Sequence, residues 1–152
     1  MQKFKFKLDG LLKVREFKEK KIKIELGEIL KEINAVEDKI KDANTAISET
    51  YDAQEAFMKD PSNGQMLQFF PLFIQGKKED IKNKENLLWS LRKKYDTKVV
   101  ELALARGEVK VMENFKEKKK TEWTKDKNKK EQEAIEEILM MRSNGSKDLV
   151  WN

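Results

Sequence analysis

The apolar residues in the first third of the chain recur at alternating steps of four and three positions. From Ile22 these steps visit a series in which only Thr50 and Gln54 are polar: Leu26, Ile29, Ile33, Val36, Ile40, Ala43, Ile47, Thr50, Gln54 and Phe57. The residues between them are mostly Lys, Glu, Asp and Asn. This heptad pattern is typical of a helix that packs along another helix. We predict a helix from about residue 4 to residue 57.

The same register weakens toward the N-terminus. Extended backwards it reaches Glu19, Arg15, Leu12 and Leu8, so the apolar stripe turns polar for one heptad. We expect this end of the helix to pack less tightly than its middle.

The stretch "MKDPSNGQ", residues 58–65, interrupts the helical pattern. Pro61 disfavours helix at Asp60, and Asn63-Gly64 tolerates the backbone conformations of a turn. The most apolar window of the chain, "MLQFFPLFIQGKKEDI", follows directly. We predict a turn and an apolar tip over residues 58–71.

A second apolar stripe follows at intervals of seven residues. It runs through Ile74, Ile81, Leu88, Tyr95, Leu102 and Val109, with Leu91, Ala105 and Met112 between them. We predict a helix over residues 72–141 and a flexible tail over 142–152, because Ser, Asn and Gly there disfavour helix. The expected fold is all-α: one domain, residues 1–152, forming a long antiparallel two-helix coiled-coil hairpin with a longer second helix.

Composition excludes several classes of chemistry. The chain has neither cysteine nor histidine, so disulfides and the usual zinc sites cannot form. Acid pairs such as Glu136-Glu137 are common on charged helices, and no phosphate-binding glycine loop accompanies them. We expect no enzyme activity, catalytic residue, cofactor, metal site or small-molecule substrate.

The stretch from Lys116 to Lys130 holds eight lysines and three acids, and Trp123 follows Lys116 by one heptad. One interpretation is a solvated helical face with positive potential, and another is a surface that meets an acidic partner. Nucleic-acid binding would call for an uninterrupted basic face. Because acidic residues interrupt this one, we do not favour nucleic acid as a partner.

The apolar window around the turn also admits two interpretations. Its residues are too numerous for a two-helix tip to bury: Leu67, Phe69, Phe70, Leu72, Phe73 and Ile74. They form either a small cap folded on the hairpin end or a docking site, since exposed aromatic clusters mark interaction surfaces.

Location is indicated by hydropathy. The opening "MQKFKFKLDGLLKVREF" interrupts its apolar residues with charge, and no apolar run of eighteen residues occurs. We expect neither a signal peptide nor a membrane span, and a cytoplasmic protein.

Several stretches resemble one family, the flagellar FliJ proteins. They are the N-terminal "KFKFKLDGLLKVRE", the middle "FIQGKKEDI", and "ELALARGEVKVMENFKEKKKTEW" followed by "EQEAIEEILMMR". The likeness covers nearly the whole chain in length and layout.

The resemblance implies a role in the type III flagellar export apparatus, and so in motility and chemotaxis. The family forms an antiparallel coiled coil placed at the centre of the hexameric export ATPase as a central stalk. It promotes assembly of the ATPase ring, links the ring to the membrane export gate protein, and has a role in escorting export chaperones. Such a protein would be peripheral at the cytoplasmic face of the inner membrane through its partners.

The resemblance also suggests contact residues. The export gate contact would involve Phe73, Ile74 and Lys77, where Lys77 replaces an expected leucine. The ATPase ring contact would come from the paired chain ends, that is from Leu11, Leu12, Arg15, Phe115, Lys118 and Trp123.

A different class of protein fits the same periodicity. A coiled-coil scaffold or chaperone could homodimerise as a four-helix bundle, which would cover Ile135, Ile138 and Leu139 at the end of the second helix.

Overall fold

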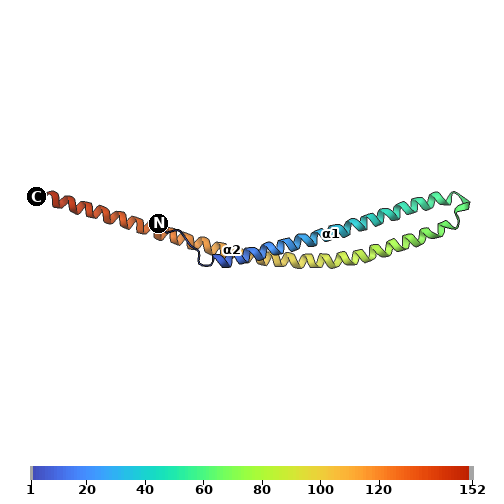
Figure 1. Cartoon of the computed structure of the whole chain (residues 1–152), viewed down its shortest axis with the longest axis horizontal. Coiled ribbons are helices and arrows are strands. Elements are labelled where there is room, and N and C mark those ends of the chain that lie inside the picture. The colour runs from blue at the N-terminus through green and yellow to red at the C-terminus, as the bar shows by residue number, and fades with distance from the viewer. Residues whose placement is uncertain (1, 151–152) are drawn as a thin grey trace. The chain divides into compact units, whose positions relative to one another are not determined.

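The structure is a computed structural model that describes residues 2–150, with side chains for residues 2–145. It contains α1 (Asp9–Met58), the short 3₁₀ helices η1 (Pro61–Asn63) and η2 (Met66–Gln68), and α2 (Phe69–Val150). The predicted all-α fold with a longer second helix is confirmed, and no strand occurs among these residues. The two long helices are labelled in Figure 1.

The chain divides into two compact units. One, here called the central hairpin, comprises residues 18–104. The other, here called the terminal unit, combines the described residues of 1–17 and 105–152. Each unit contains a part of α1 and a part of α2.

In the central hairpin, α1 and α2 lie side by side along the predicted apolar stripes (Figure 1). Its main core cluster consists of Ile29, Ile33, Val36, Leu88 and Leu91, with Ile40 and Tyr95 packed against it. Ile22, Ala43, Ile74 and Leu102 are also buried. Burying each large aliphatic side chain contributes about 2 kcal/mol, so this stripe supplies most of the hairpin's stability.

Charged side chains flank the core of the central hairpin. Lys98 on α2 donates to Glu25 on α1 at 2.7 Å, and Arg92 pairs with Glu37 at 2.9 Å. The pKa of Glu25 is lowered by its hydrogen bond from Lys98. Such exposed pairs contribute little stability.

The turn forms for the reason that its sequence predicts. The Asp60 carboxylate accepts hydrogen bonds from the Ser62 amide at 3.0 Å and the Ser62 hydroxyl at 2.8 Å, and Pro61 opens η1. Asp60 therefore caps the short helix in the manner of an Asx turn. These hydrogen bonds lower the pKa of Asp60.

Helix α1 begins at Asp9, five residues after the predicted start at residue 4. Phe4, Phe6 and Leu8 alternate with Lys3, Lys5 and Lys7, and a period of two favours an extended backbone. In a helix, residues 4 and 6 would point in different directions, whereas an extended segment places both on one side. Asp9 in the first turn then complements the helix dipole.

Helix α2 begins at Phe69 and continues to Val150, past the predicted end near Arg142. Pro71 lies in its first turn, where no amide donor is required. Beyond Pro71 the chain has no proline, and each Ser, Asn or Gly residue costs only about 1 kcal/mol or less in a helix. Of the predicted tail, residues 151–152 lie outside the described residues.

Candidate interaction surfaces

The core of the terminal unit is short. Leu12 of α1 is 4% exposed and packs with Val109 and Met112 of α2, and Phe6 covers this cluster. The next stripe position, Arg15, points its guanidinium at the backbone of α2 and donates to the Glu108 carbonyl at 3.2 Å. At this position of the α1 stripe, the contact between the two helices is therefore a hydrogen bond and not apolar packing.

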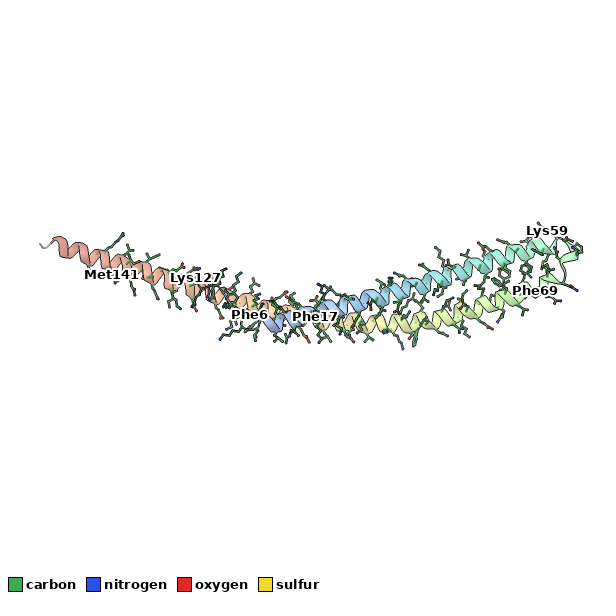
Figure 2. All side chains as sticks on the ribbon, in the orientation of Figure 1. Phe6, Phe17, Lys59, Phe69, Lys127 and Met141 are labelled. Atoms are coloured by element: carbon green, nitrogen blue, oxygen red, sulfur yellow. The ribbon has the colours of Figure 1, made fainter. Side chains whose placement is uncertain are left out.

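Residues 2–8 precede α1, and we call them the aromatic strap. The Phe4 ring lies 5.9 Å from the Trp123 ring, and the Phe6 ring lies 5.8 Å from the Phe115 ring, measured between centroids. Figure 2 labels Phe6 beside the α2 segment that leads to Lys127. Each pair has the tilted or edge-on geometry that aromatic rings favour.

Each α2 aromatic of the terminal unit also has a lysine one turn later. The Lys119 ammonium lies 5.6 Å from the Phe115 centroid, and the Lys127 ammonium lies 5.4 Å from the Trp123 centroid. The same three-residue arrangement therefore occurs twice, as Phe4, Trp123 and Lys127 and as Phe6, Phe115 and Lys119. In each, a strap phenylalanine contacts an α2 aromatic ring that also has a lysine over it. The result is a surface that is both aromatic and cationic.

An ion pair marks the junction between the strap and α1. The Lys116 ammonium lies 3.3 Å from the Asp9 carboxylate, and Lys13 lies 3.4 Å from the same group. The hydrogen bond from Lys116 is the main reason that the pKa of Asp9 is lowered. Lys116 thus occupies a core position of the heptad while its charge stays paired.

Charge is distributed unequally along the sequence. Residues 18–104 hold sixteen basic and sixteen acidic side chains, so the net charge of +5 belongs to residues 1–17 and 105–152. The terminal unit consequently carries the positive potential that the composition predicted.

Small cavities lie between the strap and α2. One of about 350 Å³ is mostly apolar, and its walls come from strap residues 4–8 with Phe115 and Lys119. Another of about 400 Å³ is lined by Gln2, Trp123, Asp126, Lys127, Lys130 and Glu131. The strap therefore rests on α2 without filling the surface beside it.

The tip of the central hairpin is the other candidate surface. Phe70 packs edge-on against Phe57 with ring centroids 5.5 Å apart, which closes the end of the hairpin. Phe69, Leu72 and Phe73 remain exposed on the first turns of α2, and Figure 2 labels Phe69 at this end. Both interpretations of the apolar window thus hold in part, since some residues form a cap and others stay accessible.

The predicted gate-contact residues lie together at the start of α2, but they differ in exposure. Phe73 is about half exposed, and the Lys77 ammonium lies 5.6 Å from its ring centroid. Ile74 is 6% exposed and belongs to the hairpin core. Only Phe73 and Lys77 therefore present side chains to a partner.

The predicted ring-contact residues all fall in the terminal unit. Leu11, Phe115 and Lys118 are exposed, Arg15 and Trp123 are partly buried, and Leu12 is in the core. Sequence reasoning missed the strap residues Phe4 and Phe6 as partners of Phe115 and Trp123. The alternation "FKFKL" was the signal that could have identified them.

Two negative findings apply to the part of the chain that the structure describes. No group of three acidic side chains there is arranged to hold a metal ion. Within the same residues, neither long helix contains a stretch apolar enough to cross a membrane.

The fold and the surfaces together define a charged helical-hairpin protein with exposed aromatic and cationic side chains. A family model described as "Flagellar FliJ protein" matches residues 4–148, nearly the whole chain. The chain belongs to the flagellar FliJ family, and it is thus a component of the flagellar export apparatus. Among curated proteins nothing matches it, and no solved structure does either.

Proposed function

We propose that this protein is the central stalk of the flagellar export ATPase, that it promotes assembly of the hexameric ring, and that it couples the ring to the export gate. The observation that carries this proposal is the concentration of the whole net charge, together with four aromatic rings, in the terminal unit. The family assignment supplies the apparatus in which that unit acts.

The terminal unit is suited to the interior of a ring. Positive potential raises the rate at which it meets an acidic or carbonyl-lined surface. Its exposed side chains Leu11, Phe115 and Lys118 offer apolar and cationic contacts. The hydrogen bond from Arg15 to the Glu108 carbonyl replaces apolar packing, so the two helices can shift locally at low cost.

The tip of the central hairpin is suited to a second partner. Phe69, Leu72 and Phe73 form an exposed apolar group, and large exposed apolar groups usually serve as interaction surfaces. We assign the export gate contact to Phe73 and Lys77 together with this group. Transient contact with export chaperones would use the same exposed residues. Attachment through the gate would keep the protein peripheral at the cytoplasmic face of the inner membrane.

The test is ATP hydrolysis and ring formation by the same bacterium's export ATPase, with and without this protein at equal concentration. We expect both the hydrolysis rate and the fraction of hexamer to rise. No change in either, while circular dichroism shows that the protein is helical, would contradict the proposal.

A matched pair of variants locates the contact. Lys118→Glu changes the charge of an exposed terminal residue and should reduce stimulation, whereas Lys82→Glu makes the same change on α2 in the central hairpin and should leave it intact. Equal loss from the two variants would indicate a general charge effect and not a local contact.

A further inference from the structure

The end of α2 carries an apolar face with no partner among the described residues. In the segment 131–145, here called the overhang, Ile135, Ile138 and Leu139 lie at helical spacing and are each more than half exposed. Met140 and Met141 are also exposed, and Figure 2 labels Met141 on this free part of the helix. A face of this size on a helix indicates that something covers it.

The overhang is acidic, whereas the helix directly before it is basic. Residues 131–137 contain four glutamates and no basic residue, and residues 116–130 contain eight lysines and three acids. The acidic overhang therefore complements the surface formed by the strap and residues 115–130. That surface also has one mostly apolar cavity, walled by strap residues 4–8 with Phe115 and Lys119, in which a large aliphatic side chain can be placed.

The two complementary surfaces of one chain cannot meet each other. Residues 116–145 form one uninterrupted helical run, so the overhang cannot fold back onto the segment that precedes it. A second copy of the chain can bring its overhang to this surface.

We propose that two copies associate reciprocally through antiparallel C-terminal halves of α2. The overhang of each copy docks against the strap and the basic segment of the other. Because each copy offers the same two surfaces, the contact closes with two-fold symmetry and does not propagate.

The register follows from the charges. A two-fold axis near residue 129 places Ile135 of one copy opposite Trp123 of the other, and Leu139 opposite Lys119 at the apolar cavity. The same register sets Glu131, on the helix face of Ile135 and Leu139, opposite Lys127, on the face of Trp123 and Lys119. A parallel arrangement would instead bring the lysine-rich segments of the two copies together, which the electrostatics disfavour.

The proposal concerns the protein alone and does not depend on the proposed role at the export ATPase. It does have a consequence for that role, because the dimer would cover Trp123 and neighbouring residues that the stalk would use. Association of two copies would then compete with binding to the ATPase.

The first measurement is the mass of the full chain by analytical ultracentrifugation over a range of concentrations and salt. We expect a concentration-dependent shift from one chain, 17.9 kDa, to two chains, and a weaker shift at high salt. A single-chain mass at every concentration would overturn the proposal, and so would growth to assemblies larger than two.

Replacing apolar residues of the overhang by Gln tests whether self-association uses the apolar face of the overhang. The double variant Ile138→Gln with Leu139→Gln keeps good helix formers and should raise the dissociation constant about tenfold or more. The matched control, Val100→Gln with Leu104→Gln, changes equally exposed residues elsewhere on α2 and should leave it unchanged. Equal effects of the two double variants would contradict docking through the overhang.

A charge exchange tests the register. Glu131→Lys, and separately Lys127→Glu, should each weaken self-association because each places like charges opposite each other across the two-fold axis. Mixing the two variant chains should restore a dimer of one chain of each kind. If the mixture associates no better than either variant alone, the antiparallel register is wrong.

Discussion

The central hairpin and the terminal unit are made from the same two helices but are stabilised in different ways. The central hairpin has a continuous apolar stripe on both helices, and its charges balance. The terminal unit has a short core cluster of Leu12, Val109 and Met112 with Phe6 against them, followed by aromatic contacts from a strap that is not helical. This difference indicates that one region supplies stability while the other keeps its surface available for contact.

The comparison predicts the largest effect for a core residue of the central hairpin. Ile33 is buried between the helices, so Ile33→Ala should lower the free energy of unfolding by about 2–3 kcal/mol. The control is Leu30→Ala on the exposed side of the same helix turn, which should cost less than about 1 kcal/mol. Urea unfolding followed by circular dichroism measures both, and similar losses would mean that the stripe does not supply the stability.

A smaller and local effect is expected for the strap. Phe4→Ala with Phe6→Ala removes two aromatic contacts of about 1 kcal/mol each and should expose Trp123 without changing the unfolding of the central hairpin. The readout is Trp123 fluorescence in a chain where Trp89 and Trp151 are replaced by Phe. We expect a red shift of its emission.

Phe17→Ala is the control for the strap variants, because Phe17 is an exposed phenylalanine of the same unit. It should leave Trp123 emission unchanged. An unchanged emission in the strap variant as well would show that the strap does not cover Trp123 in solution.

The smallest effect concerns pH. The pKa of Asp9 is lowered in the folded protein by its hydrogen bond from Lys116, so Asp9 binds its proton less readily than in the unfolded chain. Its contribution is therefore present above about pH 4 and is lost as the pH falls through the lowered pKa. Because the pair is exposed, the contribution is small.

Acid titration of Trp123 emission in the same single-tryptophan chain measures this contribution. Asp9→Asn should remove the part of the low-pH change that belongs to Asp9, leaving the response of the other carboxylates. Identical titration curves for the two chains would show that this ion pair does not hold the strap junction.

The sequence alone predicted the hairpin well because heptad spacing reports directly on burial. Every stripe position from Ile22 to Phe57 is buried or partly buried, including the polar Thr50 and Gln54. Trp123 was also expected on the stripe, and it is partly buried there. Helix periodicity is a local property of the chain, and this is why it can be read without a structure.

The ends of the helices and the strap could not be predicted in the same way. Phe4 and Phe6 fell inside the helix predicted from about residue 4, but their contacts are with residues more than one hundred positions away. The segment after Arg142 stays helical although its residues individually favour turns. Residues that contact a partner are harder still to predict from local sequence, because they lie on exposed surfaces and heptad spacing reports only on the buried ones.

The most direct test of the account uses a chain that lacks residues 1–15 in the export ATPase assay. This truncation removes the strap, Leu12 and Arg15 but leaves the heptad stripe of the central hairpin. We predict basal ATP hydrolysis and no added ring formation, with the circular dichroism of the central coil retained. Full stimulation by the truncated chain would contradict the placement of the ATPase contact in the terminal unit.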